Sequence, residues 1–267
     1  MTELAGFWSV CFFLLGSIVG SFLNVCIVRL PHERSVVFPA SHCVHCKKPI
    51  QWCDNIPLVS YLLLAGACRH CKKKISFRYF LVELITAITF LLFYKYFGLT
   101  AILIPYLVMV SGFIVATFVD FEHRIIPDEV SIGGMIAGVI FSALIPQLHG
   151  QDIFWKGALW SIVGLLAGGG SIYLMGLLGD IIFKKESMGG GDVKLMAMVG
   201  AFMGWKLAIL TFFLAPFFGA IYGLAEKIRT KESTIAYGPF LVLGALLSLF
   251  KGDEILRWVL ANYGIVY

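Results

Sequence analysis

The sequence predicts an all-α membrane protein: a polytopic helical bundle of about eight spans with a small loop subdomain held together by cysteines. Three observations predict this fold class. Hydrophobic residues make up 59% of the 267 residues and charged residues only 14%, against the roughly one quarter usual in soluble domains. Several uninterrupted apolar segments approach the roughly 20 residues that a helix needs to cross a bilayer core. Two pairs of cysteines lie in a polar segment between the first two of these apolar segments.

The expected spans follow the apolar segments in chain order. They lie near residues 6–28, 79–97, 101–119, 130–146, 157–181, 194–204, 207–225 and 238–250, and the sixth is short. The first segment lacks a basic n-region and is longer than the core of a typical signal peptide. We therefore interpret it as a retained span.

Basic residues are concentrated in the polar segments between spans. Residues 29–78 hold nine Lys or Arg but only two acids, so the positive-inside rule places this segment in the cytoplasm and the N-terminus outside. Because successive spans cross the membrane in opposite directions, the loops at 120–129, 182–193 and 226–237 are expected on the cytoplasmic side as well. The net charge of +5 is modest and follows this loop pattern, which indicates membrane lipid and not nucleic acid as the surrounding partner.

Two Cys-x-x-Cys pairs lie in the first cytoplasmic segment: Cys43 with Cys46, and Cys68 with Cys71. A separation of about 20 residues between such pairs is typical of four-thiolate zinc sites. Four thiolates complete a tetrahedral shell and leave no position for a reacting water, so the expected Zn²⁺ is structural. The alternatives are metal-free thiols or a pair of disulfides, and a reducing cytoplasm disfavours the disulfides.

Two aspartates lie at the expected cytoplasmic ends of spans. Asp120 ends the third apolar segment, where a carboxylate faces the negative end of the helix dipole. Asp192 follows three glycines, which allow close approach of another backbone, and begins an apolar helix. Ionisable groups at a membrane boundary are costly and tend to mark functional sites. The structural alternatives are an interfacial residue that reaches water for Asp120 and a helix N-cap for Asp192.

The expected topology brings Asp120 and Asp192 to the same face of the membrane. Two carboxyls a few ångström apart cannot both ionise, so they share one proton and titrate as a unit, as in aspartic proteases. The ionised carboxylate would activate water as the general base. The protonated carboxyl would polarise the scissile carbonyl and help to protonate the leaving amine. Which aspartate takes which role is open.

The residues also leave two other classes of function open. A transporter or channel would use Asp120, Asp192 and Glu83 as a proton or cation path. A membrane methyltransferase or binding module without proteolysis would tolerate the loss of either aspartate. Asn24 and Glu83 lie inside the first two spans and are candidates for lining a polar cavity, with interhelical hydrogen bonding as the alternative.

Taken together, the motifs resemble those of the bacterial prepilin peptidases, the type IV leader peptidases of the GxGD class of membrane aspartic proteases, over nearly the whole chain. The matching motifs are Gly20-Ser-Phe-Leu-Asn24 with Arg29-Leu-Pro31, the two cysteine pairs, Asn55-Ile-Pro57-Leu, Arg78-Tyr with Val82-Glu83-Leu, Asp120 to Asp128, and Gly189-Gly-Gly191-Asp192. The resemblance implies that Asp120 and Asp192 are the catalytic pair. It also implies these zinc ligands: Cys43, Cys46, Cys68 and Cys71.

The resemblance further implies a multi-pass protein of the bacterial cytoplasmic (inner) membrane. Its members cleave type IV prepilins or type II secretion pseudopilins after the glycine that ends a short basic leader, at the cytoplasmic face. They often also methylate the new N-terminal residue with S-adenosyl-L-methionine. We accordingly expect a methyltransferase-linked region at 1–98, comprising two spans and the cysteine loop, and a peptidase domain at 99–267. The cofactor-binding residues and the oligomeric state are left open, and no dinucleotide-type glycine fingerprint is present.

Overall fold

A computed structural model describes residues 2–184, 188–230 and 236–262. Parts of the expected loops at 182–193 and 226–237 therefore lie outside the described residues. Within these ranges the regular secondary structure is helical. The described residues contain no β-strand, only two isolated antiparallel bridges, His42 with Pro49 and Ala67 with Lys74. The chain divides into two compact units, Met1–Phe118 and Val119–Tyr267.

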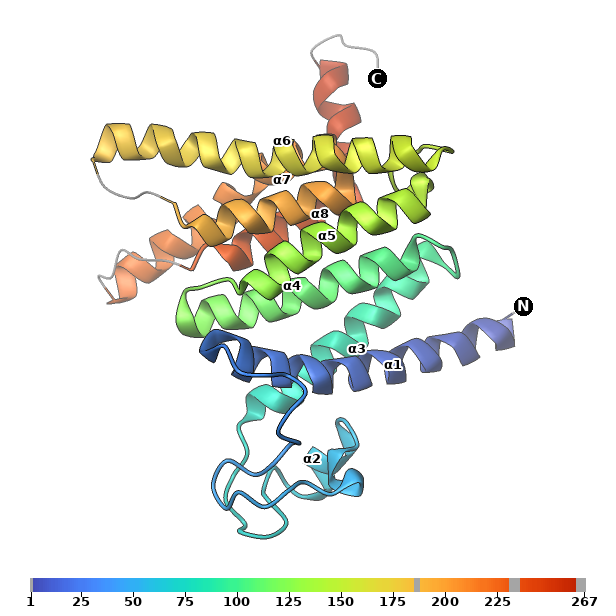
Figure 1. The fold of residues 1–267 in the computed structure, drawn as a ribbon, viewed down its shortest axis with the longest axis vertical. Coiled ribbons are helices and arrows are strands. Elements are labelled where there is room, and N and C mark those ends of the chain that lie inside the picture. Colours follow the sequence, from blue (N-terminus) through green and yellow to red (C-terminus); the bar gives the residue numbers. More distant parts are fainter. Residues whose placement is uncertain (1, 185–187, 231–235, 263–267) are drawn as a thin grey trace. The chain divides into compact units, whose positions relative to one another are not determined.

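Long helices make up most of both units (Figure 1). In chain order the helical elements are α1 (Thr2–Arg29), η1 (Leu30–His32), η2 (Trp52–Asn55), α2 (Val59–Leu63), α3 (Phe77–Phe97), α4 (Leu103–His123), α5 (Asp128–Leu144), η3 (Pro146–His149), α6 (Phe154–Phe183), α7 (Gly190–Thr230) and α8 (Gly238–Asn262). Local signals explain where several of them begin. Ser76 Oγ accepts a hydrogen bond from the Arg78 N–H and caps α3. Pro127 immediately precedes α5, whose first turn is acidic and so complements the helix dipole.

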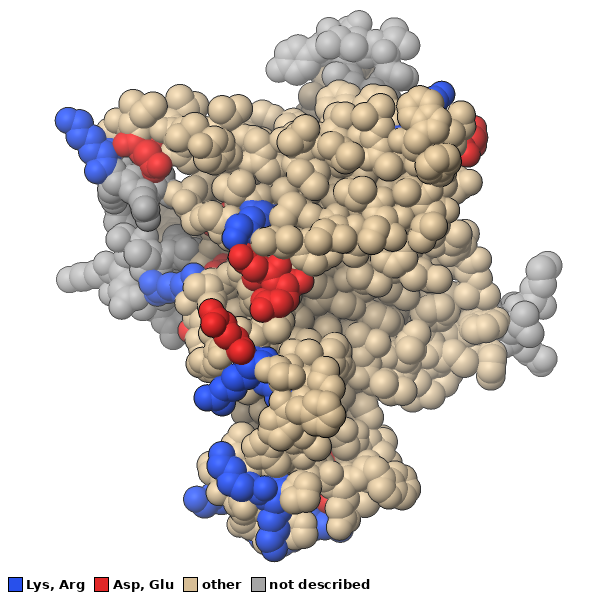
Figure 2. Space-filling model, in the orientation of Figure 1, with Lys and Arg blue, Asp and Glu red and all other residues tan. Residues whose placement is uncertain are grey.

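Five helical segments among the described residues are long and apolar enough to cross a membrane. They are Gly6–His32, Phe77–Phe97, Leu103–His123, Phe154–Ile182 and Gly190–Leu224. On the face drawn in Figure 2, the helices present few charged side chains, whereas Lys and Arg gather on the segment between α1 and α3. The all-helical membrane fold is thus confirmed, but the expected number of about eight spans is not.

The helix labelled α7 reverses its direction at Gly204. This residue has φ 77° and ψ 170°, a backbone conformation essentially restricted to glycine. Gly168 of α6 lies against both Met196 and Ala208, on either side of Gly204. A continuous helix would hold these two residues about 18 Å apart, so the two arms of α7 must run antiparallel beside α6. The reversal lies where the sequence suggested a boundary between a sixth and a seventh span.

The first arm of α7, residues 190–203, forms much of the core of the second unit. Leu195, Met196, Met198 and Phe202 are almost completely buried. Glycines of the neighbouring helices lie against this arm and let the backbones approach closely, as small residues do in membrane helix pairs. They are Gly134 and Gly138 of α5 and Gly164 and Gly168 of α6. This packing holds the N-terminus of α7, where Asp192 lies, in a defined position.

In the first unit, α1 and α3 pack through small residues. A side chain at Gly16 would lie 2.8 Å from the Ala87 backbone, and one at Gly20 would lie 2.8 Å from the Glu83 backbone. The spacing Gly16-x-x-x-Gly20 places both glycines on the same face of α1 and lets the backbone of α3 approach it closely. The cysteine loop lies between these two helices in the chain, so their pairing fixes both of its ends.

Candidate functional site

Asp120 lies in the last turn of α4 and is buried, with 6% of its surface exposed. Its Oδ2 accepts a 2.8 Å hydrogen bond from the backbone N–H of Gly238, the first residue of α8. Arg124 follows one turn later with φ 56°, and its N–H donates to the Asp120 carbonyl at 2.9 Å. The carboxyl therefore lies inside the second unit and does not extend from its surface.

Asp192 lies in the first turn of α7, because the helix begins two residues earlier at Gly190. It therefore does not occupy the N-cap position itself, although the helix dipole still favours an acid there. The glycines before it allow a close contact: a side chain at Gly191 would lie 3.2 Å from Ile126 Cβ. A larger residue at 191 would push the start of α7 away from the α4–α5 connection.

The structure brings Asp120 and Asp192 together within the second unit. The Asp120 charge acts on the Asp192 carboxyl. The buried side chain of Ile126 lies against Gly191 beside one aspartate and against Gly238 beside the other. Like charges at this proximity in a partly desolvated site disfavour ionisation of both carboxyls at once. This arrangement is chemically suited to hold one base and one acid at the same time.

A cavity of about 690 Å³ lies beside Asp192. Its wall is mostly apolar, and its lining residues are Met175, Met188, Gly189, Asp192, Phe212, Phe213, Pro216 and Tyr237. Burial, together with the Asp192 charge, raises the pKa of Tyr237 to about 12. The phenol therefore stays neutral at physiological pH and can donate a hydrogen bond. An apolar cavity with a few polar groups is the usual form of a ligand site.

The four paired cysteines converge in the loop of the first unit. Their Sγ atoms all lie within 4.8 Å of one another. Cys43 and Cys71 Sγ are 3.8 Å apart, and Cys46 and Cys68 Sγ are 4.0 Å apart. Four sulfurs at about 2.3 Å from a tetrahedral zinc ion would be separated by about 3.8 Å. The donor set and its spacing therefore fit a four-thiolate zinc centre.

The two cysteine pairs have matching backbone conformations. The N–H of Cys43 donates to the Lys48 carbonyl at 2.9 Å, and the N–H of Cys68 donates to Lys73 at the same distance. Between the cysteines and these acceptors, Lys47 and Lys72 both have φ 58°. Two equivalent turns thus present their thiols to a common centre.

The thiols of this cluster differ in acidity. Hydrogen bonds from the Cys46 backbone lower the pKa of the Cys43 thiol to about 6. The Lys73 backbone also favours the thiolate of Cys71, but desolvation and contacts with the other thiols raise its pKa to about 11. This difference is expected when one thiolate accepts hydrogen bonds from neighbouring S–H groups. A bound metal would deprotonate all four thiols.

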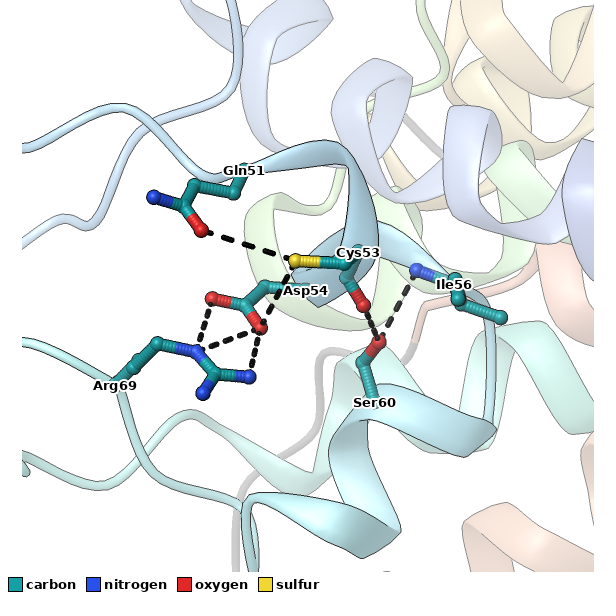
Figure 3. Close-up of polar contacts among 6 residues, drawn as sticks. All are labelled: Gln51, Cys53, Asp54, Ile56, Ser60 and Arg69. Atoms are coloured by element: carbon teal, nitrogen blue, oxygen red, sulfur yellow. Dashed lines mark hydrogen bonds and ion pairs between the residues drawn. The ribbon is translucent and has the colours of Figure 1, made fainter.

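An ion pair joins the second cysteine pair to the helical part of the loop (Figure 3). Arg69, between Cys68 and Cys71, donates from Nε and from an Nη to the Asp54 carboxylate at 2.6–2.9 Å. The hydrogen bonds from Arg69 lower the pKa of Asp54. Ser60 Oγ donates to the Cys53 carbonyl at 2.9 Å in the same region. Cys53 itself lies near Asp54 and outside the four-thiol cluster.

Glu83 and Asn24 make interhelical and loop contacts in the first unit. Glu83 Oε2 accepts a 2.8 Å hydrogen bond from the N–H of Leu58, which has φ 62°. Asn24 Nδ2 donates to the Tyr79 carbonyl at 2.9 Å, which ties α1 to α3. Asn24 Oδ1 is buried without a hydrogen-bond partner and exposes less than 1 Å². These contacts support the structural interpretation of both residues.

Sequence reasoning missed the Tyr237-Gly238-Pro239 segment, which binds Asp120 and lines the cavity beside Asp192. Tyr237 lines the cavity with Asp192, and the Gly238 N–H binds Asp120. The available signal was a Gly-Pro pair at the start of an apolar segment, where a proline favours a helix start. That signal predicts the helix start but not its hydrogen bond with Asp120, 118 positions earlier.

Comparison with known proteins gives two family matches. Residues 14–97 match the bacterial peptidase A24 N-terminal domain, and residues 107–224 match the type IV leader peptidase family. No solved structure matches the chain.

Three curated relatives named prepilin leader peptidase/N-methyltransferase align with most of the chain. The Myxococcus xanthus protein is 38% identical over 84% of this chain, which spans 64% of that relative's length. The Pseudomonas aeruginosa protein is 35% identical, with 96% of this chain and 94% of the relative covered. The Aeromonas hydrophila protein is 31% identical, with coverage of 94% and 93%.

Proposed function

Because this chain belongs to the type IV leader peptidase family, we propose that it is a membrane-embedded aspartic endopeptidase that removes the leaders of type IV prepilins or type II secretion pseudopilins. The family description and the names of the relatives support this activity. The single structural observation that carries it is the meeting of Asp120 and Asp192 at the ends of two apolar helices. These two residues are the proposed catalytic pair.

Peptide hydrolysis at this pair needs one ionised and one protonated carboxyl. The carboxylate takes a proton from water as the water oxygen bonds to the scissile carbonyl carbon. The protonated carboxyl donates a hydrogen bond to the carbonyl oxygen and stabilises the tetrahedral intermediate. Collapse of that intermediate breaks the C–N bond, and a carboxyl proton passes to the leaving nitrogen. No covalent bond forms between enzyme and substrate.

We assign the site to the cytoplasmic face of the bacterial inner membrane. The five apolar helices and the family support a membrane protein, and the excess of Lys and Arg at residues 29–78 supports the orientation. A multi-pass bundle of about eight spans would place the loops after α4 and before α7 on that side. A substrate with an apolar helix would reach the site through the lipid phase, which confines its scissile bond to the interface.

The four-cysteine cluster is proposed to hold a structural Zn²⁺ ion through Cys43, Cys46, Cys68 and Cys71. Four thiolates would fill the coordination shell, so the ion would stabilise the loop without binding a reacting water. The ion pair of Arg69 with Asp54 would then fix the metal-bound turn to the adjoining helical segment.

N-methylation of the new N-terminus is proposed as a second activity, with S-adenosyl-L-methionine as the methyl donor. The names of the relatives and the match of residues 14–97 to the family's N-terminal domain support a methyltransferase-linked region at 1–98, with the peptidase domain at 99–267. The buried acceptor Asn24 Oδ1 exposes less than 1 Å², so a ligand as large as this cofactor cannot contact it in this conformation. Asn24 therefore does not mark a site that fits this cofactor.

Mass spectrometry of a prepilin incubated with the detergent-solubilised protein tests both activities. We expect the wild type to remove the leader and the Asp120→Asn and Asp192→Asn variants each to lose at least about 1,000-fold in rate. Asp128→Asn is the matched control, because Asp128 is an exposed acid of the same region that pairs with Lys194. An added methyl mass only with S-adenosyl-L-methionine supports the second activity. Full cleavage by both catalytic variants would refute the aspartic mechanism.

A further inference from the structure

The start of α8 has one backbone donor that requires a partner outside the helix. The first N–H groups of a helix have no helical acceptor. Pro239 has no N–H, and the next two N–H groups both donate to the Tyr237 carbonyl, at 3.0 and 3.2 Å. The remaining donor is the N–H of Gly238, which is buried. Asp120 Oδ2 accepts it at 2.8 Å.

Glycine is required at position 238 for this contact. A Cβ atom there would lie 2.8 Å from Asp120 Oδ2 and 3.3 Å from its Cγ, closer than a side chain can approach without movement. The same Cβ would lie 3.3 Å from Ile126 Cδ1, so Ile126 also restricts the space for a side chain at position 238. Any larger residue must therefore move either α8 or the Asp120 carboxyl.

We propose that Gly238 is a positioning residue for the cleavage reaction, which extends the function proposed above. Its N–H fixes Asp120 Oδ2 and so leaves Oδ1 as the oxygen available to water and substrate. One hydrogen bond to a buried carboxylate is strong enough to select a single orientation, because charge-assisted bonds are about twice as strong as neutral ones. The start of α8 thus orients the carboxyl that Asp192 must meet.

A purely structural role would make Asp120 a cap for α8 and nothing more. In that case a change at Gly238 would lower the amount of folded protein without altering turnover by each folded molecule. A positioning role instead predicts a loss in kcat, because misorientation of a reacting group by about 1 Å can cost about 100-fold. Substrate binding, measured by KM, should change little.

The test compares Gly238→Ala with Gly244→Ala. Gly244 lies in the same helix, and a side chain there would be comparably crowded, 3.1 Å from the Ala215 backbone of α7, without contacting Asp120. We expect Gly238→Ala to lower the kcat for prepilin cleavage by about 10- to 100-fold with KM within about twofold of wild type. The folded Gly244→Ala protein should keep kcat within about threefold. Equal kcat in the two variants would overturn the proposal.

A second measurement does not depend on catalysis. The thermal midpoint is measured for Gly238→Ala in the wild-type and Asp120→Ala backgrounds. Removing the carboxyl relieves the crowding, so we expect the shift caused by Gly238→Ala to be at most half as large in the second background. Equal shifts would refute the contact. Absence of cleavage by the wild type would instead refute the proposed function and leave this result unaffected.

Discussion

The ammonium group of Lys194 lies 2.7 Å and 2.9 Å from the two carboxylate oxygens of Asp128. This ion pair joins the second turn of α7 to the first turn of α5. Lys194 follows Asp192 by two positions in the sequence, but its side chain is directed to a different acid. The two side chains are 40% and 57% exposed, so solvent and salt screen the pair.

Lys194→Met is expected to have small effects on stability and turnover. Exposed ion pairs contribute about 0–1 kcal/mol, so the free energy of unfolding should fall by less than about 1 kcal/mol. The kcat for prepilin cleavage should stay within about threefold of wild type. Parallel denaturation and cleavage assays check this. A fall of more than tenfold in kcat would show that Lys194 acts on Asp192.

Removal of one cluster thiol should release the metal from the loop. We expect about one zinc ion per chain in the wild type and little in Cys43→Ser, because a structural site needs all four ligands. Cys53→Ser is the matched control, because Cys53 belongs to the same loop but lies outside the cluster. Elemental analysis of the purified proteins gives the metal content. Unchanged zinc in Cys43→Ser would contradict the assignment.

We expect His149 to make the folding stability of the protein sensitive to acid. Its Nε2 lies 2.9 Å from Ser142 Oγ, and burial lowers the pKa of the imidazole below its usual 6.5. The unfolded chain therefore binds a proton near pH 6.5 that the folded chain does not, and stability falls as pH drops below that value. The thermal midpoint of wild type should decline between about pH 7 and pH 5.5 more steeply than that of His149→Gln. Parallel curves for the two proteins would exclude this contribution.

Gly204→Ala should destabilise the reversal of α7. The φ of 77° is unfavourable for any residue with a side chain, and the new Cβ would lie 3.1 Å from His149 Nδ1. We expect a loss of about 1–3 kcal/mol in the free energy of unfolding. Gly170→Ala in α6 is the control, because no atom lies within 4 Å of its added Cβ. Denaturation of the two variants side by side distinguishes strain from a general effect of the glycine change.

Local patterns were sufficient for part of this structure. The cysteine pairs were predictable because each turn brings two thiols together within four residues, and the cluster confirms their convergence. The family resemblance is also confirmed, since several spaced motifs contribute to it. The C-terminal end of α4 was expected near Asp120, and the start of α7 near Asp192, because polar residues interrupt the apolar segments there.

Contacts between distant segments were not predictable in the same way. The Gly238–Asp120 hydrogen bond joins residues 118 positions apart and uses a backbone N–H, which no residue type reveals. The reversal at Gly204 separates two apolar arms, so hydropathy alone could suggest a boundary but not the antiparallel packing. The partner of Lys194 depends on how α5 and α7 pack, which the charge pattern of either helix alone does not specify.

A comparison of single and double variants shows whether Asp120 and Asp192 cooperate in cleavage. Prepilin cleavage rates are measured for Asp120→Asn, Asp192→Asn and the double variant at matched folded concentrations. If the two carboxyls act as one unit, each single change removes nearly all activity and the double variant is no slower. Multiplicative losses, or a single variant with wild-type turnover, would show that the two carboxyls do not act as one unit.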